Sequence, residues 1–298
     1  MLENIPYIGE ILSLSVALIW AFAIILFKKS GETAHPIALN IFKNTIGLIF
    51  CLPTYFLMLK GSAFDMPFND FFLLFISGVI GIGIADTLLF KSLNILGAST
   101  LAIVDCMYAP FVIILSILFL GETLSILQII GTITIILAIL LITQKAKNGK
   151  RPSNNIILGI VLGILSMLGM AIGVVLTKPL LLNYTTMEVV ILRLAGGMFF
   201  LFITLPFIKQ RTAIIKTLFQ TKGLVYLLSG SFIGTYVAIV IWMAGLKYTQ
   251  ASIASALNQT SNVFLFILGA ILLKEAVSRK KVIAILLAVG GIYLVTFG

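Results

Sequence analysis

Runs of about 20 consecutive apolar residues recur along this chain, and they constrain its fold more than any other feature. They lie at about 11–27, 37–59, 71–90, 98–120, 126–143, 156–177, 187–208, 223–244, 252–273 and 280–297. A helix needs about 20 such residues to cross the hydrocarbon core of a bilayer, where it satisfies its backbone hydrogen bonds internally. The sequence therefore predicts an all-α integral membrane protein with ten transmembrane helices.

The composition excludes a soluble globule. Of the 298 residues 60% are hydrophobic and 10% are charged, and the mean hydropathy is +1.19, which leaves too little polar surface for solvation by water. Glu3 and Glu10 precede the first apolar run without any Lys or Arg, so we interpret this run as a spanning helix and not as a signal peptide. Cys51 and Cys106 lie within apolar runs, which favours small core side chains over a disulfide or metal site.

The basic residues between the runs predict the orientation of the helices. Fifteen follow the odd-numbered runs: Lys28, Lys29, Lys91, Lys145, Lys147, Lys150, Arg151, Lys209, Arg211, Lys216, Lys222, Lys274, Arg279, Lys280 and Lys281. Only Lys60, Lys178 and Lys247 lie on the other side. By the positive-inside rule, we expect a multi-pass protein of the cell (inner) membrane with both termini extracytoplasmic. The net charge of +10 is thereby explained without nucleic acid, which we do not expect as a partner.

The second half of the chain repeats the first. Residues 78–143 align with 231–296 at an offset of 153, and the first two apolar runs align with the sixth and seventh at an offset of 150. Matched pairs include Gly81 and Gly234, Ala98 and Ala251, Ser99 and Ser252, Glu122 and Glu275, Ser125 and Ser278, Thr143 and Thr296, Lys28 and Lys178, Lys43 and Arg193, and Gly47 and Gly197. We expect a first five-helix repeat at 1–144, a basic cytoplasmic linker at 145–155 and a second repeat at 156–298. Because five is odd, the second copy enters the membrane from the opposite face, giving two inverted repeats, as in many transporters.

With these features the chain resembles the ten-helix, EamA-like branch of the drug/metabolite transporter superfamily. The resemblance rests on the two five-span halves, on Gly121 to Ser125 (GETLS) with its counterpart Lys274 to Ser278 (KEAVS), and on the basic residue in the second span of each half. It implies a central cavity lined mainly by helices 1, 3, 4, 6, 8 and 9, with amino acids or other small metabolites as common cargo. Lys43 stands where family members more often carry Arg.

Ionisable residues inside the spans are functional candidates, because a charge in the membrane is costly unless it is paired or hydrated. These residues are Lys43, Asp86, Asp105, Glu188 and Arg193. Lys43, Asp86 and Asp105 are expected at one depth, in the cytoplasmic half of the membrane.

The acidic pair breaks the symmetry of the repeat. The equivalents of Asp86 and Asp105 in the second half are Ile239 and Asn258. In one hypothesis Asp105, with or without Asp86, binds a cationic part of the substrate or carries a coupling proton, because burial disfavours the ionised carboxylate. In the other, Lys43 and one Asp form a structural ion pair between helices 2 and 3. Two carboxylates face one nearby Lys, so both hypotheses stay open.

Helix 9 carries a polar stripe at helical spacing, formed by Ser255, Asn258, Gln259 and Asn262. It is expected either to line a cavity and hydrogen-bond the cargo or to bond neighbouring helices. Pro110 on helix 4 is expected to bend that helix.

Aromatic residues give a further set of candidates. Trp20, Tyr108, Tyr236 and Trp242 offer ring faces to a cation or to a ring-bearing substrate, although packing explains many aromatic residues in membrane proteins. We expect Glu122 and Glu275 to be helix-start residues, each complementing the N-terminus of the next helix. The glycines of helix 6 are expected to permit close helix contact.

No enzyme, metal site or cofactor is expected, since the single His35 accompanies no catalytic or nucleotide-binding motif. The leading hypothesis is a secondary active transporter of small polar or zwitterionic metabolites such as amino acids, with export favoured by the resemblance. The alternatives are an uptake carrier for an organic cation and a non-transporting membrane subunit or receptor. A small-molecule substrate and the lipid bilayer are the expected partners, with a coupling proton and a monomer or a homodimer left open.

Overall fold

The computed structural model describes residues 6–31, 35–58, 66–121, 125–143, 154–208, 211–212, 216 and 223–297. All ten predicted apolar runs are helical within these residues, and no strand occurs among them. The first half comprises α1 (Ile8–Gly31), α2 (Pro36–Met58), α3 (Phe68–Gly78), η2 (Val79–Ile84), α4 (Ala85–Leu96), α5 (Ala98–Asp105), α6 (Tyr108–Leu120) and α7 (Ile126–Thr143). The second comprises α8 (Asn154–Thr177), η3 (Lys178–Leu182), α9 (Thr186–Thr204), η4 (Leu205–Phe207), α11 (Leu224–Ser231), η5 (Phe232–Val237), α12 (Ala238–Tyr248), α13 (Ala251–Asn258), α14 (Ser261–Leu272) and α15 (Arg279–Phe297).

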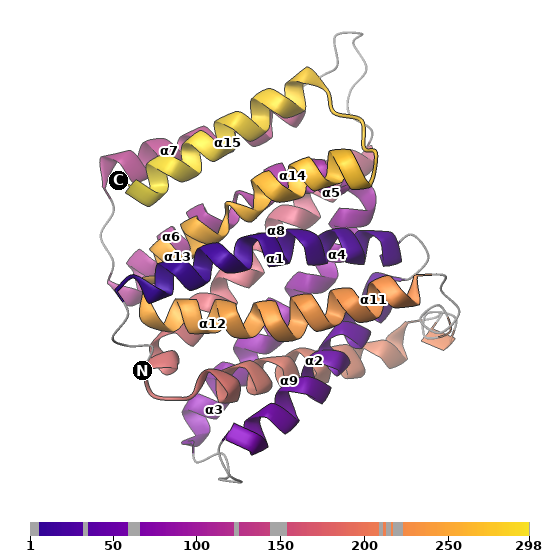
Figure 1. The fold of residues 1–298 in the computed structure, drawn as a ribbon, viewed down its shortest axis with the longest axis vertical. Coiled ribbons are helices and arrows are strands. Elements are labelled where there is room, and N and C mark those ends of the chain that lie inside the picture. Colours follow the sequence, from indigo (N-terminus) through magenta and orange to yellow (C-terminus); the bar gives the residue numbers. More distant parts are fainter. Residues whose placement is uncertain are drawn as a thin grey trace.

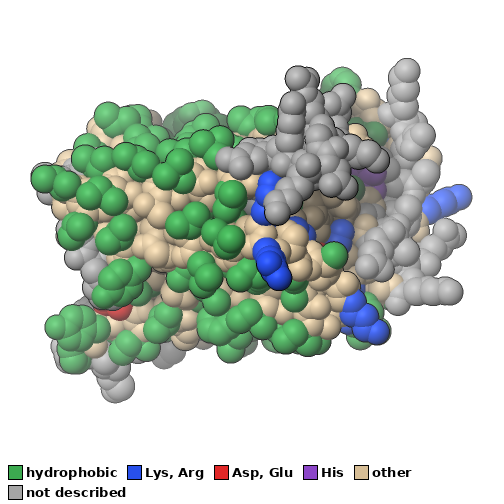
Figure 2. Space-filling model, turned by 90° about the horizontal axis from the view of Figure 1, so that it is seen from above, with side chains coloured by type: hydrophobic (Ala, Val, Ile, Leu, Met, Phe, Trp, Pro, Cys, Tyr) green, Lys and Arg blue, Asp and Glu red, His purple; other side chains and the backbone are tan. Residues whose placement is uncertain are grey.

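The helical segments have the length and apolar composition of membrane-spanning helices. Within the described residues, eight of them are long and apolar enough to cross a membrane, and α7 contributes a shorter apolar stretch at Ile126–Ala138. Apolar side chains cover much of the face seen in Figure 2, and basic side chains gather towards one end of the molecule. The predicted all-α membrane fold is therefore confirmed.

Irregularities of the helices recur at equivalent positions in the two halves. The third span is interrupted by the π-helical η2 and the eighth by the π-helical η5, and these two segments differ by the repeat offset of 153 residues. The fourth span breaks between α5 and α6, and the ninth breaks between α13 and α14 at the same offset. The repeat therefore extends to local backbone geometry.

Proline alone does not cause these breaks. Pro110 lacks the N–H that would bond the carbonyl of Cys106 in a regular helix, and the first break lies at 106–107. The equivalent residue in the second half is Val263, yet that half also breaks, at 259–260. There the turn tightens through Thr260 N–H donating to the Leu257 carbonyl and Asn262 N–H donating to the Gln259 carbonyl.

The two halves interlock around a common centre. Helix α1 packs against α12 and α14, and its equivalent α8 packs against α4 and α6. The fifth helices of the halves, α7 and α15, lie side by side at one edge of the bundle (Figure 1). This arrangement leaves the other eight spans to surround the centre.

Glycines bring the helices of the centre close together, as the sequence predicted for helix 6. A Cβ on Gly163 would lie 2.8 Å from the Val104 side chain, and one on Gly173 would lie 2.9 Å from the Ser77 carbonyl. Helix α8 therefore approaches the third and fourth spans through its small residues.

Glu275 caps a different helix from the one that the sequence suggested. Its carboxylate accepts hydrogen bonds from the backbone N–H groups of Ala98 (2.7 Å) and Ser99 (2.8 Å), at the start of α5 in the other half. The short joint before α5 is Gly97, whose φ of +77° ends α4. The third span consequently runs to Leu96, beyond the predicted 90.

Several sequence predictions lie outside the described residues. Glu122 and most of the predicted linker at 145–155 are among them, as are the basic residues Lys60, Lys145, Lys147, Lys150, Arg151, Lys209 and Lys222.

Candidate functional site

A cavity of about 140 Å³ lies at the centre of the bundle. Eight of the ten spans line it, and α7 and α15 do not. Helices 1, 3, 4, 6, 8 and 9 contribute, as the family resemblance implied, and α2 and α9 add Lys43 and Arg193. The two basic residues of the second spans therefore meet in one chamber.

The cavity follows the internal symmetry of the chain. Of its 24 lining residues, 20 form ten pairs of equivalent positions. The pairs are Trp20 and Met170, Ile24 and Val174, Lys43 and Arg193, Gly81 and Gly234, Ile82 and Thr235, Asp86 and Ile239, Leu89 and Trp242, Phe90 and Met243, Asp105 and Asn258, and Tyr108 and Ser261. The chamber thus lies where the two repeats meet, and differences within a pair give it its chemical asymmetry.

Lys43 and Asp86 form an ion pair between α2 and α4. The Lys43 Nζ lies 2.6 Å from Asp86 Oδ2 and donates to Asn44 Oδ1 at 2.9 Å. Lys43 is only 6% exposed, so its charge needs this compensation. The geometry agrees with the hypothesis of an ion pair joining helices 2 and 3.

A polar network beside this pair was missed by the sequence analysis. The Asn40 Nδ2 donates to the carbonyls of Ile82 (2.9 Å) and Gly83 (3.1 Å) in η2 and to Thr87 Oγ1. Its own Oδ1 accepts from Asn44. The side chain of Asn40 thereby satisfies carbonyl groups of the π-helical turn. Two Asn residues at i and i+4 in an apolar run were the available signal.

Arg193 is buried in the cavity wall without a carboxylate partner. Its Nη1 donates to Met243 Sδ at 3.3 Å, and its Nε has no hydrogen-bond partner. No Asp or Glu oxygen among the described residues lies within 4.0 Å of the guanidinium, because the position equivalent to Asp86 is Ile239. A Cβ on Gly81 or Gly173 would lie 3.2 Å from Nη2, so small residues make room for this group.

Asp105 is the second charged group without an oppositely charged partner. It lines the cavity at the end of α5, and no Lys or Arg nitrogen in the described part of the chain lies within 4.0 Å of its carboxylate. Tyr108, three residues along the chain, lines the same cavity. One chamber therefore contains an anion and a cation that form no ion pair within 4.0 Å among the described residues, although Arg193 also interacts electrostatically with Asp86.

The polar stripe of helix 9 divides between the two roles that the sequence left open. Asn258 lines the cavity. Gln259 instead donates from Nε2 to the Asp105 carbonyl at 3.0 Å, and Asn262 bonds to Gln259 and to Cys106 Sγ. The side-chain amides of Gln259 and Asn262 therefore connect the break between α13 and α14 to the break between α5 and α6. Ser255 lies outside the cavity lining.

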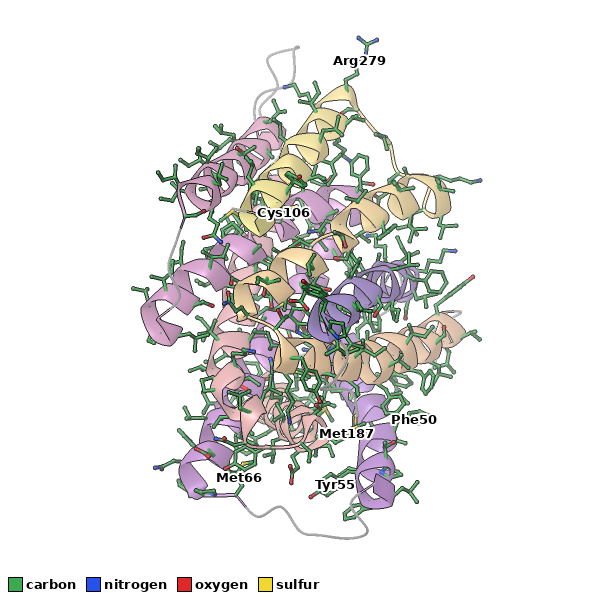
Figure 3. All side chains as sticks on the ribbon, turned by 60° about the vertical axis from the view of Figure 1, so that its left-hand side comes forward. Phe50, Tyr55, Met66, Cys106, Met187 and Arg279 are labelled. Atoms are coloured by element: carbon green, nitrogen blue, oxygen red, sulfur yellow. The ribbon has the colours of Figure 1, made fainter. Side chains whose placement is uncertain are left out.

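The aromatic candidates also separate. Trp20 and Trp242 line the cavity with ring centroids 6.0 Å apart, and Tyr108 lines it as well. Tyr236 does not. Its hydroxyl shares a hydrogen bond with Thr54 (2.9 Å) and its ring packs against Phe50, which lies on α2 at the margin of the bundle (Figure 3).

Comparisons with known proteins agree with this architecture. The model of the EamA-like transporter family matches residues 7–144 and again residues 157–297. An uncharacterized transporter of Archaeoglobus fulgidus is 24% identical over 285 residues, covering 95% of this chain and 96% of that protein. Protein PecM of Dickeya dadantii is 24% identical over 255 residues, covering 83% of this chain and 81% of PecM. A solved crystal structure superimposes with a TM-score of 0.67 at 17% identity, over 95% of this chain and 96% of the other; it supports the fold alone.

Proposed function

Because this chain belongs to the EamA-like transporter family, we propose that it is a secondary active transporter of small zwitterionic metabolites such as amino acids, which it exports by alternating access. The observation that carries the cargo class is the pair of cavity charges that have no ion-pair partner within 4.0 Å among the described residues, Asp105 and Arg193. Inverted repeats that meet at a central chamber supply two exchangeable conformations, which is what alternating access requires.

The charges select a zwitterion on simple electrostatic grounds. A buried charge without a counter-ion is costly, so each of these two groups favours a polar or oppositely charged partner in the cavity. An amino acid supplies both partners, with its ammonium at Asp105 and its carboxylate at Arg193, and both interactions are charge-assisted hydrogen bonds. A simple amine would leave Arg193 uncompensated, and a simple carboxylate would leave Asp105 uncompensated.

The test is exchange of labelled amino acids by the purified protein in liposomes, with binding measured in parallel by thermal stabilisation. Loss of one charge-assisted hydrogen bond costs about 1.5–3 kcal/mol, so Asp105→Asn and Arg193→Gln should each weaken zwitterion binding about 10- to 100-fold. Asp70→Asn is the matched control, because Asp70 lies outside the cavity and accepts from Tyr184. Zwitterion binding unchanged in both cavity variants would contradict the proposal.

Export has its own experiment. Cells preloaded with the labelled substrate should lose it faster when they express the wild-type protein than when they express Asp105→Asn. Faster accumulation from outside would reverse the proposed direction. Saturable exchange in liposomes that contain only this protein would exclude a subunit that needs a partner for transport.

An organic cation is the second candidate cargo. Trp20, Tyr108 and Trp242 line the same chamber as Asp105, and aromatic faces with a carboxylate are suited to bind ammonium groups. The discriminating ligands are an amino acid and the amine that lacks only its carboxylate. Tighter binding of the amine, unaffected by Arg193→Gln, would favour the cation.

A further inference from the structure

Three of the helices that line the cavity present only apolar side chains to it. Helices α1, α8 and α12 contribute only apolar side chains to the lining, among them Trp20, Ile24, Met170 and Trp242. The charged and polar lining residues come from the other contributing segments, chiefly α2, α4, α5 and α9. The chamber is therefore amphipathic, and the apolar side chains that α1, α8 and α12 contribute to it are called the apolar wall below.

Part of this apolar wall is not closed by packing within the protein. Trp20, Ile24, Met170 and Ile239 remain partly exposed, although each lines the central cavity. Water against such a surface is unfavourable, whereas an apolar group of the cargo would cover it. Indole rings and the flexible thioethers of Met167, Met170 and Met243 suit contact with side chains of differing shape.

We infer that the substrate is an amino acid with a large apolar side chain, and that the apolar wall binds this side chain, which is aliphatic, thioether or aromatic. This inference rests on the proposed function. The charged headgroup occupies the Asp105 and Arg193 side of the chamber, and the side chain lies against α1, α8 and α12. Small or polar amino acids make the same headgroup contacts but leave the apolar wall in contact with water.

The experiment is a ligand series with one headgroup: alanine, norvaline, norleucine, methionine, phenylalanine, tryptophan and glutamine. Affinity is measured by thermal stabilisation and by competition for exchange in liposomes. Each methylene buried should lower Kd about fourfold, and glutamine, with nearly the length of methionine, should bind no better than alanine. Equal affinities for alanine, glutamine and norleucine would overturn the inference.

Two variants test the location of the side chain. Met170→Ala enlarges the chamber and should shift the preference from methionine towards tryptophan. Ile24→Phe reduces it and should shift the preference towards alanine, because Ile24 is partly exposed and the added ring enters the cavity. Met198→Ala is the matched control, since Met198 is buried on α9 outside the lining. If neither cavity variant changes the order of the series while both remain folded, the assigned wall is wrong.

The two proposals fail in different ways. If zwitterions bind in an Asp105- and Arg193-dependent manner but without dependence on chain length, the inference fails and the proposed function stands. If the affinity for apolar amines increases with chain length and exceeds the affinity for the amino acids, the role of the apolar wall is supported and the proposal of a zwitterionic substrate is contradicted. Binding of none of the ligands would contradict both.

Discussion

The ionisable residues of the cavity differ in how their charges are compensated. Lys43 has Asp86 at 2.6 Å, whereas its equivalent Arg193 donates to the sulfur of Met243 and has no carboxylate within 4.0 Å among the described residues. One aspartate, Asp86, therefore has an ion-pair partner within the fold, and the other, Asp105, is the one that we propose binds the cargo. The two hypotheses for the acidic pair thus apply to different residues.

The ion pair between α2 and α4 should behave as a structural unit. Asp86→Ile reproduces the second half at this position but leaves Lys43 buried without a counter-ion, which should cost about 3–5 kcal/mol of the free energy of unfolding. Lys43→Met combined with Asp86→Ile removes both charges and should recover most of that loss. Unfolding in detergent micelles measures the cycle. A double variant as unstable as the sum of the single variants would show that the two residues are not coupled.

At the scale of elements, the start of α5 is held by a residue from the other half. Glu275 accepts from the N–H groups of Ala98 and Ser99, where a carboxylate also complements the positive end of the helix. Gly97, immediately before them, has φ +77° and ψ 169°, a conformation that is almost confined to glycine. A Cβ there would lie 2.6 Å from Glu275 Oε1.

Gly97→Ala should therefore be destabilising for two reasons, the backbone and the contact with Glu275. Gly121→Ala is a milder reference, because Gly121 has φ +71° and ψ 19°, in the left-handed helical region, and a Cβ there meets nothing within 4 Å. We expect Gly121→Ala to cost about 1–2 kcal/mol and Gly97→Ala at least 1 kcal/mol more. In a Glu275→Ala background the part of this excess that comes from the contact should disappear, whereas the part that comes from the ψ of 169° at Gly97 should remain. A cost of Gly97→Ala that is the same in the wild type and in the Glu275→Ala background would refute the contact.

Two lysines make matching contacts in the two halves. The Lys28 Nζ donates to the Leu93 carbonyl (3.2 Å) and the Asn94 carbonyl (3.5 Å), at the end of α4. Its equivalent, Lys178, donates to the carbonyls of Leu246 and Thr249, at the end of α12. A cation near a helix C-terminus stabilises that end by about 1 kcal/mol. In inverted repeats the two contacts lie at opposite membrane faces.

Each lysine should therefore stabilise its own end of the molecule. Lys28→Met should speed hydrogen exchange about fivefold at the end of α4 and leave the end of α12 unchanged, and Lys178→Met should do the reverse. Lys29→Met serves as the control, because the Lys29 ammonium stands over the Tyr226 ring at 5.1 Å. Hydrogen exchange that becomes faster at the ends of both α4 and α12 in either variant would indicate that the whole protein is destabilised. It would contradict a local stabilisation by each lysine.

The elements show which features a single sequence can predict. Run length was enough for the ten helices, because the bilayer fixes the length of a span. The π-helical η2 and η5 and the break before Ser261 were not foreseen, because each depends on contacts with other helices, such as those of Asn40 with Ile82 and Gly83. The prediction that Glu275 caps the next helix was wrong for the same reason, since Ala98, whose N–H it accepts from, lies 177 residues away in the sequence.

The candidate site was predictable to the extent that charge in an apolar run is conspicuous. Lys43, Asp86, Asp105 and Arg193 all line the cavity. Spacing alone could not separate Asn258, which lines it, from Gln259 and Asn262, which bond across to the break in helix 4. Tyr236 failed to reach the cavity because its hydroxyl bonds to Thr54 on α2.

At the scale of the whole molecule, the cavity does not follow the symmetry of the two repeats at one of its ends. Of the four lining residues without a lining equivalent, Phe27 and Leu93 lie near the ends of α1 and α4. Their equivalents, Thr177 and Leu246, are fully buried and outside the lining. The chamber therefore extends towards the end where α1 terminates, which the basic residues predict to be cytoplasmic.

Exchange of conformation between inverted repeats should transfer this extension to the opposite end. In the alternative state, positions 177 and 246 should line the cavity while positions 27 and 93 should leave its lining. Single cysteines at these four positions test this in a background without the buried Cys51 and Cys106. Membrane-impermeant thiol reagents should label Phe27→Cys and Leu93→Cys from the α1 end, and Thr177→Cys and Leu246→Cys from the other. A substrate that drives the conformational exchange should raise the labelling of positions 177 and 246 and lower that of positions 27 and 93. The two changes are coupled because every molecule that enters one state leaves the other. Transport that continues while positions 177 and 246 stay unreactive would show that the halves do not exchange conformations.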